Sequence, residues 1–101
     1  HEIGALMEGS GIHFIDTPVS GGYSGAQQGT LTMMASAPAN ILAQFKPVLT
    51  AVSATIHQVG TTAGMGQTVK ACLQTLIGSI FSATFEASVL AAKAGVDGQA
   101  L

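Results

Sequence analysis

The chain has 101 residues, of which 48% are apolar and only 8% are charged. Soluble domains usually carry about 25% charged residues, so this composition predicts that other residues normally cover much of the surface. The length allows one domain at most, with a modest core. There is no arginine, and three scattered lysines do not form the cation cluster that a nucleic-acid surface needs.

The cysteine and histidine residues exclude further classes of site. The single cysteine, Cys72, excludes an internal disulfide, suits a reducing compartment such as the cytoplasm, and is expected as a packed core thiol. His1, His13 and His57 have no metal-ligand spacing, so we expect ordinary surface or strand positions and no metal. The chain starts without methionine and ends just past a helical pattern, which predicts a fragment of a longer protein.

Taken in chain order, the first two thirds of the sequence predict alternating helices and strands. A helix tail over residues 2–8 ends at Gly9-Ser10-Gly11. Strands are expected over residues 13–19, 30–35 and 55–59, with Met33 and Met34 filling the core. Between the last two strands, residues 40–52 have helical spacing, and Pro47 is expected to kink or split that helix. This order predicts an α/β arrangement.

The last third of the sequence predicts one long helix. From Gly66 to Ala94 the apolar residues repeat with a period of 3.6, and Gly95 ends the pattern. A helix with so few charges is expected to be buried between neighbours. Its charge-free run, residues 71–85, is fifteen residues long, and a helix that spans a bilayer needs about 20. We therefore expect a buried core helix and no membrane segment.

Two glycine-rich clusters interrupt these patterns, and the second invites a dinucleotide-binding interpretation. GTTAGMGQTVK, residues 60–70, follows a strand and opens a helix, as a dinucleotide fingerprint does. However, Val69 occupies the third-glycine position, and the acidic residue twenty positions after Gly66, Glu86, lies inside an unbroken helical pattern. The dinucleotide interpretation of this cluster is therefore rejected.

The first cluster, within DTPVSGGYSGAQQGTL at residues 16–31, makes no P-loop, because no lysine follows its glycines. Gly21 and Gly22 allow the backbone to turn so that successive N–H groups point into one concavity. Such a nest binds a carboxylate, and the hydroxyl of Ser20 adds a donor. The alternative is a plain glycine-rich turn before an antiparallel strand.

Both clusters together resemble the β-hydroxyacid dehydrogenase family. D-x-P-V-S-G-G followed by G-T-L begins at Asp16, and G-x-G-x-x-x-K follows about fifty residues later and ends at Lys70. The family includes 3-hydroxyisobutyrate dehydrogenase, tartronate semialdehyde reductase and, more distantly, 6-phosphogluconate dehydrogenase. The resemblance covers essentially the whole chain. It implies that residues 1–63 form the C-terminal portion of a Rossmann-like cofactor domain with a mixed sheet. Residues 64–101 would then form the first long helix of an all-α substrate and dimerisation domain.

The resemblance also implies roles for individual residues. Ser20, Gly21 and Gly22 match the motif that holds the substrate carboxylate, and Lys70 matches the catalytic lysine. Gln74 stands where the family usually carries an asparagine that contacts substrate, so the identity of the substrate stays open. The family's N-terminal G-x-G-x-x-G segment, which binds the nicotinamide cofactor, is not in this sequence, so no cofactor-binding residue is assigned.

The residue types around Lys70 agree with such a role. The positive end of the helix dipole and the apolar neighbours Val69 and Leu73 disfavour an ammonium group there, which suits a lysine that exchanges protons. Gln74, four residues later, lies on the same helix face and could orient the same oxygen. The alternative is a surface lysine that caps a turn.

These observations predict a fragment of an NAD- or NADP-dependent oxidoreductase. It would transfer hydride between the cofactor and a small 2- or 3-hydroxy acid or its semialdehyde, with Lys70 as general acid/base, and the fragment alone would neither bind cofactor tightly nor turn over. We also expect a homo-oligomer formed through the long helix. The alternative function is a non-catalytic module that dimerises through that helix, in which Lys70 and Ser20 could be replaced without loss. A membrane-associated helix is the third possibility.

Overall fold

The computed structural model describes residues 2–101. Its elements, in chain order, are α1 (Glu2–Met7), β1 (Val19–Ser20), α2 (Gly22–Gln28), β2 (Leu31–Ser36), α3 (Ala39–Thr50), β3 (Ser53–Gly60) and α4 (Met65–Lys93). The described residues up to Lys70 form one compact unit, and Ala71–Leu101 form another. The predicted order of strands and long helices is confirmed, with two local exceptions.

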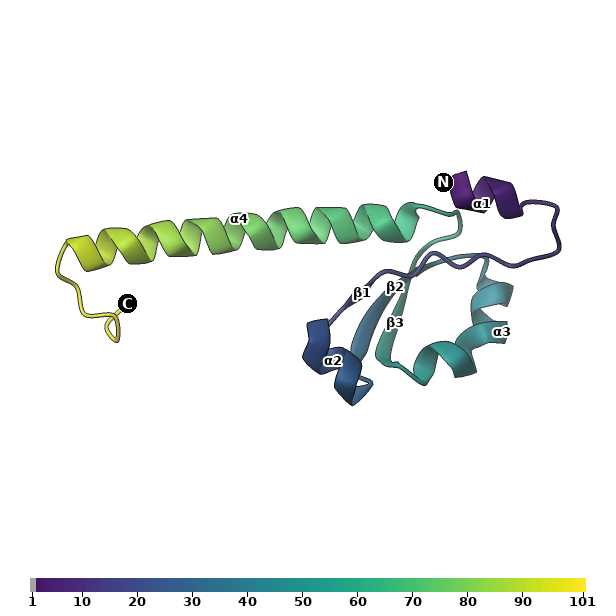
Figure 1. The fold of residues 1–101 in the computed structure, drawn as a ribbon, viewed down its shortest axis with the longest axis horizontal. Helices are drawn as coiled ribbons and strands as arrows, with labels where there is room; N and C mark the ends of the chain where they lie inside the picture. Colours follow the sequence, from purple (N-terminus) through teal and green to yellow (C-terminus); the bar gives the residue numbers. More distant parts are fainter. Residues whose placement is uncertain (1) are drawn as a thin grey trace. The chain divides into compact units, whose positions relative to one another are not determined.

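A three-stranded mixed sheet forms the centre of the first unit, and β2 lies between β1 and β3 (Figure 1). β1 runs antiparallel to β2, with Val19 opposite Met33, and β3 runs parallel to β2, with Met34 opposite His57. Two parallel strands need a crossover connection, and α3 supplies it. The mixed sheet with its helices confirms the predicted α/β class.

The core lies along the central strand, β2. Residues 33–37 are buried in succession, as expected for a strand that is covered on both faces. The prediction that Met33 and Met34 fill the core is confirmed, since their side chains are 4% and 5% exposed. Besides these two, the described apolar core holds only Ala35, Ala37 and Ile41. Most large apolar side chains therefore stay on the surface of this chain.

The stretch on either side of β1 differs from the prediction. The strand expected over residues 13–19 is reduced to β1 and one antiparallel bridge between Asp16 and Ser36, because no described strand lies beside the residues before Asp16. The stretch after β1 contains an unpredicted helix, α2, whose seven residues are small or polar apart from Tyr23 and carry no apolar period. Gly29, with φ at +68°, ends α2, and the N–H of Thr30 donates to the carbonyl of Gly25 at 2.9 Å.

The two longer helices follow the predicted ranges closely. α3 continues through Pro47, so the helix is not split there as the sequence alone suggests. α4 is 29 residues long and ends at Lys93, and Gly95, two residues later, has a φ of +81°. The N–H of Val96 donates to the carbonyl of Ala91 at 3.0 Å, which is the bond that such a glycine permits at a helix end.

The part of α4 in the second unit exposes its apolar side chains. Leu76, Phe81 and Phe85 are 58%, 57% and 66% exposed, and Cys72 is exposed as well. The predictions of a buried helix and a packed thiol are therefore wrong for this chain by itself, where these side chains are exposed. By length and composition α4 could also cross a membrane, with a mean hydropathy of 1.4 over its 18-residue window, although core helices of soluble proteins pass the same test.

Candidate substrate-binding and proton-transfer site

The predicted carboxylate-binding residues lie where β1 ends and α2 begins. Ser20 is the last residue of β1, lies opposite Thr32 of β2, and is partly exposed. Gly21 and Gly22 have φ angles of +130° and +59°, which residues with a side chain rarely adopt. A Cβ atom on Gly22 would meet nothing within 4 Å. The backbone turn therefore borders open space, in which a small ligand could reach it.

The N–H groups of this turn have no partner in the loops and caps of the described chain. The carbonyl oxygen of Pro18, four residues before Gly22, accepts the N–H of Met34 at 3.0 Å and is thus already engaged. No described turn, loop or cap bond uses the N–H of Gly21 or of Gly22 as donor. Unpaired and exposed N–H groups at a glycine turn are the donors that an anion-binding nest uses.

Lys70 lies in the second turn of α4 and is the last residue of the first unit. Its side chain is partly buried, whereas Gln74, one helical turn later, is exposed. Gln74 belongs to the second unit, and its role beside Lys70 stays a prediction.

The glycines of the second cluster let the start of α4 pack closely against the sheet. A Cβ atom on Gly66 would lie 2.6 Å from the carbonyl oxygen of Met34 and 2.8 Å from Cδ of Pro18. A Cβ atom on Gly60 would lie 2.8 Å from Cβ of Met65. Protein atoms thus fill the space beside Gly60 and Gly66, and these two glycines serve close packing.

Asp16 connects the two clusters. Its side chain is only 6% exposed, and its Oδ2 atom accepts hydrogen bonds from the N–H groups of Gly64, at 2.9 Å, and Gln67, at 3.2 Å. These N–H groups stand at the start of α4, where a helix leaves its backbone donors without internal partners. A neighbouring side chain usually accepts them, but Gly64 has none, and a carboxylate 48 residues away in sequence does so instead.

Further hydrogen bonds hold this connection to the sheet. The backbone of Asp16 pairs with that of Ser36, with N–H···O distances of 3.1 and 2.7 Å. The hydroxyl of Ser36, which is 1% exposed, donates to the carbonyl oxygen of Thr62 at 2.7 Å. Asp16 and the turn before α4 are therefore both anchored to the end of β2.

The contact between Pro18 and Gly66 relates the predicted site residues to one another. Ser20 lies two residues beyond Pro18, about 7 Å along an extended strand. Lys70 lies four residues beyond Gly66, about 6 Å along a helix. Ser20 and Lys70 thus each lie only a few residues from the contact between Pro18 and Gly66 in the first unit.

No role is predicted for Asp16 from the sequence, although this residue opens the D-x-P-V-S-G-G motif. A signal was present: the residue directly before α4 is Gly64, which has no side chain to cap the helix. Such a helix needs an acceptor from elsewhere in the chain. Only the fold identifies which acidic residue supplies it.

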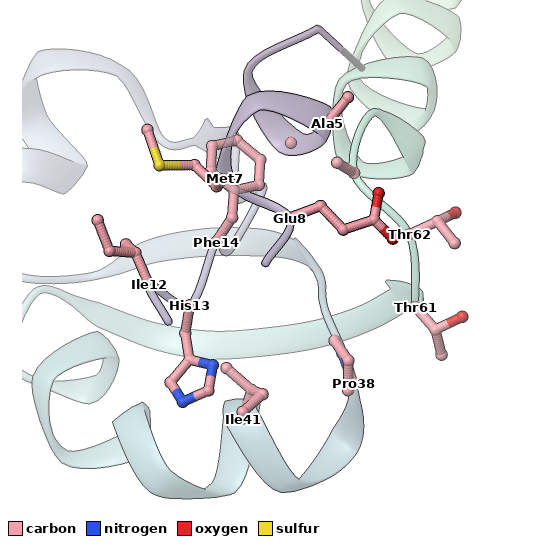
Figure 2. A pocket seen from close by; sticks show the side chains of 12 residues that line it. Ala5, Met7, Glu8, Ile12, His13, Phe14, Pro38, Ile41, Thr61 and Thr62 are labelled. Carbon is pink, nitrogen blue, oxygen red and sulfur yellow. The ribbon is translucent and has the colours of Figure 1, made fainter. Parts of the chain in front are cut away.

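A cavity of about 440 Å³ lies beside α1 and the start of α3 in the first unit (Figure 2). The segment before β1 and residues 61–63 complete its walls. Its lining is mostly apolar, with Glu8 and His13 as the titratable side chains. None of the predicted site residues lines this cavity, so its size does not make it the substrate site.

The histidines and acidic residues do not form a metal site in residues 2–101, where no group of three potential ligands comes together. His13 contacts Phe45 edge to face, with ring centroids 6.3 Å apart, and His57 is exposed. His1 lies outside the described residues. His13 thus makes an aromatic contact and His57 lies at the surface on a strand, which are ordinary positions of the kind expected.

Comparison with known proteins identifies relatives along the whole chain. Residues 1–60 match the family described as the NAD binding domain of 6-phosphogluconate dehydrogenase. The chain is 40% identical to L-threonate dehydrogenase of Escherichia coli over 95 residues, which cover 94% of this chain and 32% of that protein.

Solved structures agree with these sequence matches. The structure of 3-hydroxyisobutyrate dehydrogenase from Mycobacterium tuberculosis with L-serine has 37% sequence identity and a TM-score of 0.90. That match covers 97% of this chain and 33% of the solved one. Another solved chain, in complex with NADP+, is 26% identical with a TM-score of 0.74, over 95% of this chain and 34% of that one. The chain thus spans about a third of the length of the relatives that it matches.

Proposed function

This chain belongs to the β-hydroxyacid dehydrogenase family, and we propose that it supplies the substrate-binding and proton-transfer residues of an NAD- or NADP-dependent oxidoreductase. The substrate is a small 2- or 3-hydroxy acid or its semialdehyde. The observation that carries the proposal is the packing of Gly66, one helical turn before Lys70, against the segment that leads into Ser20. This contact supports the proposal because it lies four residues before Lys70 and two residues before Ser20.

Substrate binding is assigned to the turn after β1. The N–H groups of Gly21 and Gly22 and the hydroxyl of Ser20 bind the substrate carboxylate, which fixes the orientation of the carbon chain. The open space beside Gly22 supports this assignment, because a ligand needs access to the backbone there. A carboxylate is common to the hydroxy acids in the proposed substrate class, so this turn recognises the class and leaves the rest of the molecule to other residues.

Proton transfer is assigned to Lys70. During oxidation its amine takes the proton of the substrate hydroxyl, and during carbonyl reduction its ammonium returns that proton. Gln74, on the same helix face, donates to the same oxygen and orients it. The nicotinamide cofactor supplies the hydride exchange when it is bound. The family's N-terminal G-x-G-x-x-G segment, which binds this cofactor, is not in this sequence, so no residue of this chain is assigned to the cofactor.

The proposal extends to the architecture of the whole protein. Residues 1–63 end its cofactor domain, and residues 64–101 begin a helical domain that joins copies of the protein into a homo-oligomer in the cytoplasm. The exposed apolar side chains of α4 support the proposed homo-oligomer, because so many apolar side chains in water would promote aggregation. They include Leu76, Ile80, Phe81, Phe85, Val89 and Leu90.

Replacement of Lys70 in the complete protein tests the catalytic assignment. We expect Lys70→Ala to lower kcat by about 100- to 10,000-fold, the usual contribution of a general acid/base, while the Kd of the nicotinamide cofactor stays within twofold. Turnover is followed by cofactor absorbance with L-threonate and 3-hydroxyisobutyrate as first substrates. Added small primary amines should restore part of the lost rate, because they replace the missing proton acceptor.

Lys93→Ala is the matched control, since Lys93 lies in the last turn of the same helix and is exposed. This variant should keep the kcat of the parent. If Lys70→Ala also keeps it, Lys70 has no role in the reaction and the non-catalytic dimerisation module becomes the better hypothesis.

Charge introduced on the exposed face of α4 tests the homo-oligomer. Phe81 and Phe85 stack with ring centroids 6.1 Å apart, and Phe85 is 66% exposed. Phe85→Glu should shift the complete protein to a smaller species in sedimentation velocity, because a carboxylate cannot be buried in an apolar interface. Gln99→Glu adds the same charge beyond the helix and should leave the mass unchanged. An unchanged mass for both variants would remove α4 from the interface.

A further inference from the structure

The carboxylate of Asp16 is buried in a way that calls for an explanation. A buried ionised carboxylate is costly unless hydrogen bonds replace its water. Its Oδ2 atom accepts the N–H groups of Gly64 and Gln67, at 2.9 and 3.2 Å, and both belong to the positive end of α4. The carboxylate therefore binds the start of one helix, and the same helix carries Lys70.

The two hydrogen bonds fix the helix start in both position and direction. Gly64 precedes the first residue of α4, and Gln67 is its third residue, so the carboxylate holds the approach and the first turn together. On the other side, the backbone of Asp16 is paired with Ser36 of β2. Asp16 thus links the sheet to the helix through a single short side chain.

Both parts of the proposed site depend on this link. Lys70 follows Gln67 by three residues, or about 4.5 Å along the helix axis. Ser20 follows Asp16 by four residues in the same segment. A helix start that loses the carboxylate can shift against the sheet, and Lys70 then moves relative to the substrate turn.

We propose that Asp16 is a positioning residue of the reaction, which holds Lys70 at its working distance from the turn that binds substrate. The inference rests on the proposed function. A positioning residue differs from an ordinary helix cap in what its loss changes. Loss of a cap that only stabilises the fold lowers the melting temperature, whereas loss of a positioning residue lowers kcat of the folded enzyme.

The test uses Asp16→Ala and Asp16→Asn in the complete protein. Asp16→Ala should lower kcat by about 100-fold, since displacements near 1 Å cost this much, while the cofactor Kd stays within twofold. Asp16→Asn should recover kcat to between threefold and tenfold below the parent, because its amide oxygen can accept both N–H groups more weakly. In both variants the primary deuterium isotope effect on hydride transfer should rise, and amide exchange at Gly64 and Gln67 should be faster.

Asp97→Ala is the matched control. The Oδ1 atom of Asp97 accepts the N–H of Gln99 at 2.8 Å in an exposed turn, so this variant also removes a carboxylate that caps backbone. It should leave both kcat and the isotope effect at parent values.

A folded Asp16→Ala enzyme with kcat within twofold of the parent would overturn the inference. If Asp16→Ala does not fold, Asp16→Asn decides: the expected loss with a raised isotope effect supports positioning, and parent values of both overturn it. Lys70→Ala is measured in the same series. Parent turnover in Asp16→Ala beside an inactive Lys70→Ala overturns only the role of Asp16, whereas parent turnover in Lys70→Ala overturns the proposed function itself.

Discussion

The two glycine clusters of this chain look alike in sequence and differ in what lies beside them. At Gly22, in the first cluster, a side chain would project into open space, although the backbone has a φ of +59°. At Gly66, in the second, a side chain would collide with the carbonyl oxygens of Met34 and Asp16, at 2.6 and 3.0 Å. Gly22 thus leaves room for a ligand, although Gly21 beside it packs against Leu31, whereas Gly66 leaves room only for protein.

A glycine motif therefore has to be interpreted from the atoms that surround the point where a Cβ atom would stand. The second cluster has the spacing of a phosphate-binding loop, but its close approach is to strands of the same chain. The first cluster lacks the lysine of a P-loop, yet it exposes unpaired N–H groups. Under the proposed function, the first cluster therefore binds the substrate, and the packed second cluster holds the start of the helix that carries Lys70.

The largest effect that would test this comparison is expected at Gly66. Gly66→Ala should destabilise the protein by at least about 3 kcal/mol, because the new methyl group meets backbone atoms, which cannot turn aside as a side chain can. Chemical denaturation of the complete protein, followed by circular dichroism, measures the loss.

Gly78→Ala serves as the control in the same helix, since a Cβ there meets nothing within 4 Å in this chain. It should be neutral or stabilising by up to about 1 kcal/mol, the difference in helix propensity between the two residues. A Gly66→Ala protein as stable as its parent would show that the start of α4 is not tightly packed, and the positioning of Lys70 would lose its basis.

The order of the longer elements follows from the sequence, because each depends on local periodicity and on breakers. The short strand-forming runs at residues 30–35 and 55–59 predict β2 and β3, and the period of 3.6 with Gly95 predicts the length of α4. α2 could not be predicted, since it has a single large apolar residue, Tyr23, and its bounds follow from the φ angles of Gly21 and Gly29. The site residues were proposed from motifs, and the sequence offers no way to see their arrangement.

The features that sequence could not provide are the ones that join distant segments. Asp16 and Gly64 are 48 residues apart, and no local pattern signals that one accepts a hydrogen bond from the other. The burial expected for α4 was wrong for a related reason. Apolar periodicity predicts that a face will be covered, but not whether the covering residues belong to the same chain.

The smallest effect on stability is expected at Gly22, and this variant tests directly whether the open space beside Gly22 binds a ligand. Gly22→Ala should cost about 1–2 kcal/mol of stability, the penalty for an L residue with positive φ, because no atom obstructs the new methyl group. It should also raise the KM for the hydroxy acid about tenfold, since the backbone N–H turns away from the carboxylate, while kcat falls less.

Gly9→Ala separates the two consequences of that change. Gly9 has a φ of +76° and also has nothing within 4 Å, but it lies after α1, outside the proposed site. The two variants should lose similar stability in denaturation experiments, and only Gly22→Ala should change KM. Equal KM values for both would mean that the open space beside Gly22 is ordinary solvent. The carboxylate would then have to bind elsewhere, and the contrast between the two glycine clusters would be one of packing alone.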